Sequence, residues 1–196
     1  MPDQPMSNIK RICVYCGSGP GNNPAYAAAA KELGQDMAER NIGLVYGGGS
    51  LGLMGIVARS VLEHGGHVTG IIPQFLKDRE LMLGDVQDSV VTTNMHERKM
   101  LMFEKSDAFV ALPGGVGTLE ETVEMTTWAQ LDQHRKPIVL ANIEDFWNPL
   151  INLLDHMRED AFIRAGLEVA IDVAPTAKDV VPMVLKRAKK VAAAAS

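Results

Sequence analysis

Short apolar runs alternate with longer stretches of helical periodicity along most of this chain. The apolar runs predict strands at residues 10–16, 43–46, 67–72, 89–92, 107–112, 137–141 and 169–173. The periodic stretches predict helices at residues 25–40, 51–64, 95–105, 118–131, 147–158 and 177–190. Residues 74–87 show neither pattern, and we assign no element to them.

Strands that alternate with helices in this way indicate the α/β class. The strand runs are almost continuously apolar, as expected when helices cover both faces of a parallel sheet. The expected fold is therefore a doubly wound, mainly parallel, Rossmann-like sheet of about seven strands with helices on both faces. The sequence has no internal repeat and no linker-like stretch, so residues 1–196 are expected to form a single domain, with residues 1–8 flexible.

Composition narrows the class of partner. A chain of 196 residues buries enough surface for a core of its own. Its formal net charge of −5 argues against binding nucleic acid or an anionic membrane by bulk attraction. No apolar run reaches the roughly 18 residues that span a bilayer. The first apolar stretch, residues 12–16, is too short for a signal-peptide core, so we expect a cytoplasmic protein.

The two cysteines form a C-x-x-C pair, Cys13 and Cys16, inside the first predicted strand. An odd spacing on a strand points the two side chains to opposite faces of the sheet. Redox pairs of this spacing normally lie at a helix N-terminus, where the thiolate is stabilised. The sequence therefore predicts two small buried residues and not a redox site.

Three glycine-rich turns follow predicted strands, at residues 17–19, 47–49 and 114–117. Ligands of doubly wound folds bind outside the carboxyl ends of the strands. Glycine lets backbone N–H groups approach a ligand, and the helix that follows adds partial positive charge. Together, the three turns predict a site for a nucleotide-like anion.

Several familiar sites are absent from the sequence. The first turn is not G-x-G-x-x-G, and no acidic residue ends the second strand, which argues against a conventional NAD site. There is no P-loop and no G-x-S-x-G nucleophile elbow. The five histidines have no ligand-like spacing, so no metal site is expected.

The strongest local signal is the stretch from Pro113 to Glu121, in which glycines precede Thr118 at the expected start of a helix. Thr118 and Glu121 have the spacing of a capping box, in which the glutamate would only satisfy a backbone N–H. The same residues also suit a site in which Thr118 binds phosphate and Glu121 acts in catalysis. The residues alone leave both interpretations open.

A second signal is the charged stretch at residues 95–100, just after the fourth strand. Arg98 and Lys99 point about 100° apart on a helix, so one or both could reach the glycine loop. Arginine offers a planar fork for phosphate or carboxylate, and lysine a point charge. A solvated charged helix face is the alternative interpretation.

Four motifs in order carry a resemblance to a known family: VYCGS at 14–18, GGGSLGLMG at 47–55, MHERK at 95–99 and PGGVGTLEE at 113–121. With them the chain resembles the LONELY GUY family of cytokinin-activating phosphoribohydrolases, formerly described as possible lysine decarboxylases. The resemblance covers residues 10–157, and the part beyond Gly166 that it does not match bears on assembly more than on chemistry.

The resemblance implies hydrolysis of the N-glycosidic bond of N6-modified adenosine 5′-monophosphates to free base and ribose 5-phosphate. It implies Arg98 and Glu121 as catalytic residues. The substrate-binding residues that it implies are Ser18, Gly48, Gly49, Glu80, Met95, Arg98, Lys99, Gly114, Gly115, Gly117, Thr118, Glu120 and Glu121.

The resemblance further implies a homodimer with its active site near the subunit contact, and no cofactor. Two alternatives remain at this stage. A non-catalytic nucleotide-binding or sensor protein would bind AMP without releasing ribose 5-phosphate. A pyridoxal-phosphate-dependent decarboxylase would need a Schiff-base lysine, for which Lys99 is the one lysine near the predicted site.

Overall fold

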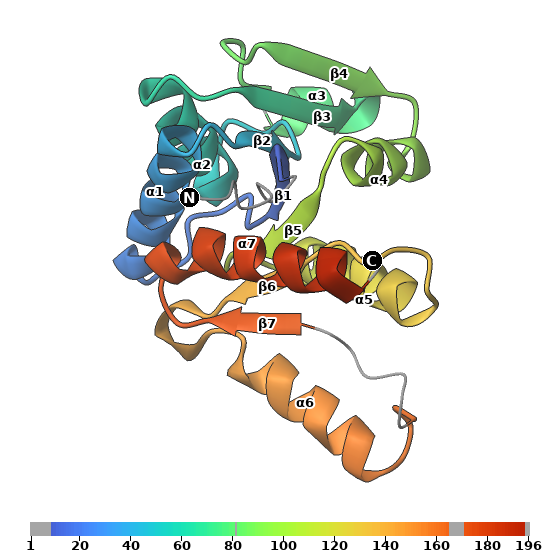
Figure 1. The fold of residues 1–196 in the computed structure, drawn as a ribbon. Coiled ribbons are helices and arrows are strands. Elements are labelled where there is room, and N and C mark those ends of the chain that lie inside the picture. Colours follow the sequence, from blue (N-terminus) through green and yellow to red (C-terminus); the bar gives the residue numbers. More distant parts are fainter. Residues whose placement is uncertain (1–8, 81, 165–170, 195–196) are drawn as a thin grey trace.

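Seven strands form one parallel sheet in the order β4-β3-β2-β1-β5-β6-β7 (Figure 1). The structure is a computed structural model that describes residues 9–80, 82–164 and 171–194. The strands are β1 (Arg11–Tyr15), β2 (Gly43–Tyr46), β3 (Val68–Pro73), β4 (Asp88–Thr92), β5 (Ala108–Ala111), β6 (Ile138–Ala141) and β7 (Ile171–Ala174). The predicted α/β class and the parallel sheet are confirmed.

Helices connect the strands and cover both faces of the sheet (Figure 1). They are α1 (Pro24–Glu39), α2 (Gly52–Glu63), α3 (Gln74–Glu80), α4 (Met95–Glu104), α5 (Val116–Gln130), α6 (Asn148–Glu159) and α7 (Ala177–Ala194), with the short 3-10 helix η1 (Ile143–Asp145). Residues of α1, α2 and α7 pack in one hydrophobic core, and residues of α4 and α5 pack in a second core on the other face.

Cys13 and Cys16 show how the strands divide between these cores. Cys13 belongs to the α4–α5 core and Cys16 to the α1–α2–α7 core, and both are buried free thiols. Burial raises the pKa of both thiols far above the usual value. The prediction of two buried cysteines on opposite faces of the sheet is confirmed.

The strand order reverses at β1, which pairs with β2 on one side and β5 on the other. The two loops that leave β1 and β5 meet there, because the backbone N–H of Gly17 donates to the carbonyl of Pro113 at 3.1 Å. The reversal point of a doubly wound sheet is where such folds place their ligands. The glycine turns after β1 and β5 thus come together at the carboxyl edge.

Two predicted helix boundaries are confirmed in detail. Asn94 is the N-cap of α4, and its side chain accepts a hydrogen bond from the N–H of Glu97 at 3.0 Å. The carboxylate of Glu97 reaches back to the N–H of Thr93 at 2.7 Å, which lowers its pKa. Helix α2, predicted to end at residue 64, stops before Gly65, which adopts a positive φ of 75° as glycines at helix ends often do.

Other boundaries differ from the prediction. Residues 74–80, which had no predicted element, form helix α3. Helix α5 begins at Val116 and not at Thr118. The last strand is confirmed over Ile171–Ala174, whereas residues 169 and 170 of the predicted strand, and residues 1–8 expected to be flexible, lie outside the described residues.

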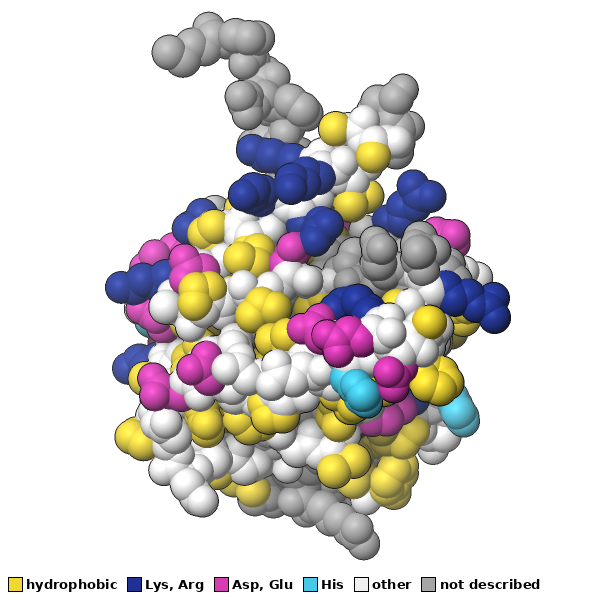
Figure 2. All heavy atoms as spheres, turned by 90° about the horizontal axis from the view of Figure 1, so that it is seen from below, with side chains coloured by type: hydrophobic (Ala, Val, Ile, Leu, Met, Phe, Trp, Pro, Cys, Tyr) yellow, Lys and Arg dark blue, Asp and Glu magenta, His cyan; other side chains and the backbone are white. Residues whose placement is uncertain are grey.

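The outer surface carries charges of both signs. Seen from below, Lys and Arg side chains gather towards the top of the visible face, and Asp and Glu side chains are spread over the rest (Figure 2). Within the described ranges, no helix is long and apolar enough to cross a membrane.

Candidate active site

The start of α5 is an uncapped helix N-terminus at the carboxyl edge of the sheet. Gly115 is the N-cap residue, and the described structure gives it no side-chain capping bond. The N–H of Leu119 donates to the carbonyl of Gly115 at 3.1 Å. The N–H groups of Val116, Gly117 and Thr118 precede that bond and have no partner within the helix. This end of α5 therefore offers several amides and partial positive charge to an anion.

Two glycines of this loop leave the amides open to a ligand. A Cβ atom on Gly115 or Gly117 would meet no atom of the described residues within 4 Å, and the φ of Gly115 is −91°. Neither a protein neighbour nor the conformation of Gly115 explains a glycine there. Gly114 differs, because a Cβ on it would collide with the side chain of Thr118. Gly114 thus serves packing, whereas Gly115 and Gly117 keep the approach to the helix end clear.

The glycines of the turn at residues 47–49 mainly make packing contacts inside the protein. A Cβ on Gly47 would collide with the guanidinium of Arg98. Gly48 has a φ of +83°, its carbonyl accepts from the N–H of Leu83 at 3.2 Å, and Gly49 forms an isolated bridge with Met82. That the three turns form one anion cradle stays a prediction; the structure shows that this turn is buried and holds Arg98.

Arg98 is the buried cation of the site, with 6% of its surface exposed. Its Nε donates to the carbonyl of Ile71 at 3.2 Å, and its Nη2 donates to the carbonyl of Gly47 at 3.3 Å. These carbonyls lie towards the carboxyl ends of β3 and β2. The solvated-face interpretation is wrong for Arg98, because two backbone acceptors fix its guanidinium inside the protein.

Glu121 lies opposite Arg98 on α5. Its Oε1 is 4.0 Å from Nη1 of Arg98, and 13% of its side chain is exposed. The capping-box interpretation fails, because α5 begins at Val116 and Thr118 is already its third residue. A carboxylate one turn inside a helix cannot cap that helix start, and Glu121 faces Arg98 instead.

Met95 completes this cluster from the first turn of α4. Its sulfur lies 3.9 Å from Nη1 of Arg98, the same nitrogen that faces Glu121. Met95, Arg98 and Glu121 are thus brought together as predicted.

Lys99 joins α4 to α5 through two carboxylates. Its Nζ donates to Glu120 at 2.7 Å and to Glu124 at 3.0 Å. Burial on its own lowers the pKa of Lys99, but the two carboxylates outweigh it and the pKa is raised. Lys99 is therefore a firmly protonated ammonium, and Glu120 is its partner.

A pocket of about 270 Å³ lies at the point where the strand order reverses. Ser18, Gly114 and Gly115 line it, as do the aromatic rings of Tyr26 and Phe146. The sequence analysis missed the two aromatic residues. The available signal was that each lies near the start of a helix that follows a strand end, but such aromatic residues are usually part of the core.

The side chain of Glu80, another predicted binding residue, lies outside the described residues. In the ranges that the structure covers, no group of three or more His, Cys, Asp or Glu side chains could hold a metal ion.

Comparisons with known proteins fit this geometry. A family model described as possible lysine decarboxylase matches residues 54–184. The chain is 49% identical over 175 residues to the cytokinin riboside 5′-monophosphate phosphoribohydrolase LOG1 of Arabidopsis thaliana, covering 89% of this chain and 82% of that protein. It is 47% identical to LOG of Oryza sativa subsp. japonica over 89% of this chain and 72% of that protein.

Among solved structures, the Moco carrier protein from Chlamydomonas reinhardtii shares the fold. It has a TM-score of 0.69 and 22% identity, covering 93% of this chain and 99% of that chain. The molybdenum cofactor binding protein of Rippkaea orientalis gives a TM-score of 0.67 at the same identity, covering 91% of this chain and 97% of that chain. At this identity the likeness concerns the fold alone.

Proposed function

This chain belongs to the possible lysine decarboxylase family, together with the phosphoribohydrolases to which it is nearly half identical, and we propose that it hydrolyses adenosine 5′-monophosphates at the N-glycosidic bond. Water adds to the anomeric carbon, the bond to the base nitrogen breaks, and that nitrogen takes a proton. The products are the free base and ribose 5-phosphate. The observation that carries the proposal is the Arg98–Glu121 pair beside the uncapped start of α5.

The phosphate is held by the backbone of the glycine loop. The amides at Gly115 and Gly117 and the hydroxyl of Thr118 lie at the start of α5, and Ser18 lines the same pocket as Gly115. A phosphate there gains hydrogen bonds and the field of the helix. Such remote binding energy assists the chemistry at the anomeric carbon. Adenosine, which lacks the phosphate, should therefore react far more slowly than AMP.

Glu121 is the group that acts on the reacting carbon. Cleavage of an N-glycosidic bond, like that of other glycosides, passes through an oxocarbenium-like state that a nearby carboxylate stabilises. The same carboxylate can orient the attacking water. Glu121 is one turn further along α5 than the phosphate amides, on the side of Arg98. In the proposed mechanism, the ribose lies between the glycine loop and the Arg98 guanidinium.

Arg98 acts on the departing base and on Glu121. A guanidinium stays protonated, so Arg98 cannot be a general base. Its Nε and Nη2 are held by carbonyls of β3 and β2, while Nη1 faces Glu121 and Met95. That nitrogen is placed to donate to the leaving base. Gly47 supports Arg98 by accepting from Nη2, and Lys99 with Glu120 keeps α4 against α5.

A pyridoxal-phosphate decarboxylase does not fit these residues. A Schiff base forms from a neutral lysine amine. Lys99 is instead a cation between Glu120 and Glu124, with its pKa raised. Lys136, whose pKa burial lowers, precedes β6 at the opposite edge of the sheet.

The test is product analysis after incubation with AMP and with several N6-substituted analogues. The expected result is release of the free base and ribose 5-phosphate, with adenosine far slower. Binding of AMP without release of ribose 5-phosphate would instead identify a sensor protein. The analogue series also shows which N6 substituent the site prefers.

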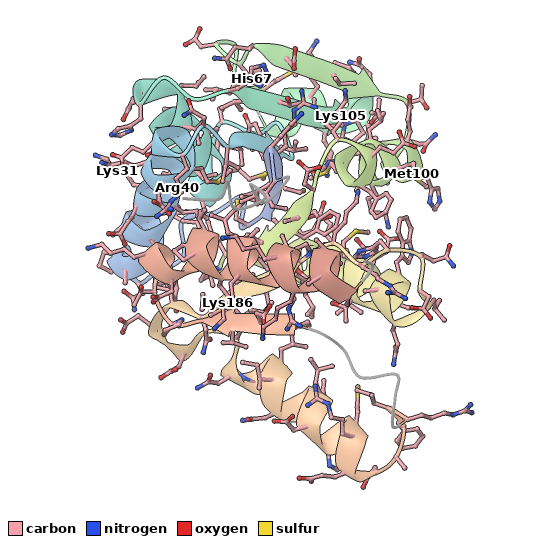
Figure 3. All side chains as sticks on the ribbon, viewed as in Figure 1. Lys31, Arg40, His67, Met100, Lys105 and Lys186 are labelled. Atoms are coloured by element: carbon pink, nitrogen blue, oxygen red, sulfur yellow. The ribbon has the colours of Figure 1, made fainter. Side chains whose placement is uncertain are left out.

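Assembly as a homodimer is part of the proposal. Val116, Leu119 and Val123 form an exposed apolar row on α5, with Val116 82% exposed. Met100 on α4 is also an exposed apolar side chain (Figure 3). A second copy of the chain is proposed to cover this row. A monomer by light scattering at micromolar concentration would contradict this.

We place this activity in the cytoplasm, in one domain that spans the chain. The two buried free thiols, Cys13 and Cys16, support a reducing compartment. The seven strands of one sheet support a single domain.

A further inference from the structure

The parts of α4 and α5 that lie nearest the candidate active site meet through charged side chains. Further along the two helices, the ring of Phe103 on α4 packs edge to face on that of Trp128 on α5, with centroids 5.2 Å apart. The first buried apolar side chain of α5 is Met125, and that of α4 is Met102. Towards Arg98, charged contacts therefore set the spacing of the two helices.

Lys99 links the two helices in this region. It follows Arg98 on α4, and its Nζ donates to Oε1 of Glu120 at 2.7 Å and to Oε1 of Glu124 at 3.0 Å. The two glutamates are four residues apart, so they lie one turn apart on one face of α5. Lys99 thus holds two successive turns of α5, and Glu121 lies between them in the sequence.

Of the two carboxylates, that of Glu124 is the more enclosed. Its side chain is 24% exposed, against 50% for that of Glu120. Its Oε2 is buried and has no hydrogen-bond partner among the described residues. A buried carboxylate oxygen without a partner lowers stability, so fold stability is a poor reason for a charge there. Because solvent screens an exposed ion pair more, Glu124 contributes more than Glu120 to holding Lys99.

The distance between Arg98 and Glu121 shows what this link does. Nη1 and Oε1 are 4.0 Å apart, whereas a guanidinium and a carboxylate in a charge-assisted hydrogen bond come within about 2.7–2.9 Å. Closing that distance would occupy Nη1, which the proposed mechanism needs for the leaving base. Carbonyls of β2 and β3 hold Arg98 from the other side, so the position of α5 decides the distance.

We propose that Glu124 is a positioning residue, which through Lys99 keeps Glu121 apart from Arg98. With α5 held in this place, Nη1 stays available to the base, and the Glu121 carboxylate stays available to the anomeric carbon. Glu124 itself touches neither the substrate nor the reacting atoms. This inference rests on the proposed function, because the roles of Arg98 and Glu121 are those of the proposed hydrolysis.

The experiment compares Glu124→Gln, Lys99→Met and the double variant with the wild type. Glu120→Gln is the matched control, because it removes the more exposed carboxylate from the same lysine, and Lys99→Arg keeps a cation between the two carboxylates. For each protein, kcat and KM for AMP are measured, alongside a thermal melt. Crystal structures of the wild type and the two single variants give the distance between Nη1 of Arg98 and Oε1 of Glu121. Either single variant carries the test if the other fails to fold.

In Lys99→Met, kcat should fall by about 10- to 100-fold, as when reacting groups are displaced by up to about 1 Å. KM for AMP should stay nearly unchanged, because the amides that hold the phosphate remain in place. Glu124→Gln should lose about tenfold in kcat, and the double variant should be no worse than Lys99→Met, because Glu124 acts through Lys99. Glu120→Gln and Lys99→Arg should lose much less. In the crystal structures of both single variants, the distance should close to about 2.8 Å.

A raised KM with an unchanged kcat in Lys99→Met would overturn the inference, since the lysine would then bind the substrate directly. So would losses that multiply in the double variant, or a distance that stays at its wild-type length in folded variants. If the wild type releases no ribose 5-phosphate from AMP, the proposed function fails. The distance in the two variants then decides on its own whether Glu124 and Lys99 hold Glu121 apart from Arg98.

Discussion

Nη1 of Arg98 on α4 lies 4.0 Å from Oε1 of Glu121 on α5, in a part of the protein from which most water is excluded. The arginine is held by two backbone carbonyls, and the glutamate lies one turn beyond an uncapped helix start. Burying two charges costs free energy, so such a pair is weak evidence for stability. The pair lies near the reversal point of the sheet, where ligands of such folds bind. A role in the reaction therefore explains the pair better than a role in stability.

Arg98→Lys should lose activity on the order of 10²-fold, by analogy with the removal of other preorganised electrostatic groups. A lysine has one ammonium and cannot donate to Ile71 and Gly47 while also facing Glu121. The measurement is ribose 5-phosphate release at saturating AMP. Gly47→Ala should reduce the same rate without changing any titratable group, because its methyl group would displace the guanidinium. Full activity in both variants would contradict the assigned role of Arg98.

Gly117→Ala should raise the stability of the protein and weaken its binding of AMP. Position 117 lies in the first turn of α5 with open space around it, so alanine should raise the free energy of unfolding by about 0.4–1 kcal/mol. The methyl group would crowd the phosphate, and KM for AMP should rise several-fold. Gly114→Ala is the contrast, because its Cβ would collide with Thr118 and should lower the melting temperature. A Gly117→Ala protein with an unchanged KM would show that phosphate does not bind there.

Because His134 is buried, the stability of the folded protein should fall in mild acid. Its ring is buried between Phe103 and Phe109; its Nδ1 accepts from the N–H of Lys136 at 3.1 Å, and its Nε2 is 2.9 Å from the carbonyl of Met125. Burial lowers its pKa. The unfolded chain therefore binds the proton more readily, and stability is lost as pH falls through the unfolded value of about 6.5.

The check is a series of thermal melts between about pH 8 and about pH 5, a range that brackets the unfolded-state pKa of about 6.5. The wild type should melt at lower temperature towards the acid end. His134→Phe, which cannot titrate, should show a flatter profile even if it is less stable throughout. Equal slopes for the two proteins would exclude His134 as the source.

The sheet was predictable because each buried strand is an apolar run bounded by glycine or polar residues. The short helix α3 was not, since its seven residues, QFLKDRE, are too few to show a helical period. The start of α5 was placed too late, because Gly115 and Gly117 are poor helix formers and mask a helix that begins at Val116.

The site was predictable only as a set of motifs. The neighbouring residues Arg98 and Lys99 look equivalent in sequence, yet one is buried against β2 and β3 and the other pairs with Glu120 and Glu124 on α5. That division depends on how α4 packs against α5, which is a tertiary contact. The glycines of the 47–49 turn likewise resemble those at 114–117, and only the position of Arg98 distinguishes a packing role from a binding role.

The most direct test of the account is the turnover of Glu121→Gln, because glutamine keeps the shape of the side chain and removes its charge. We expect ribose 5-phosphate release to fall on the order of 10²–10³-fold, as for the loss of other charge-stabilising groups. The protein should still fold, since Arg98 keeps its two carbonyl acceptors. The matched control is Glu120→Gln, which removes the adjacent, half-exposed carboxylate that pairs with Lys99, and it should lose much less activity. A Glu121→Gln protein that melts normally and turns over AMP at the wild-type rate would contradict the mechanism.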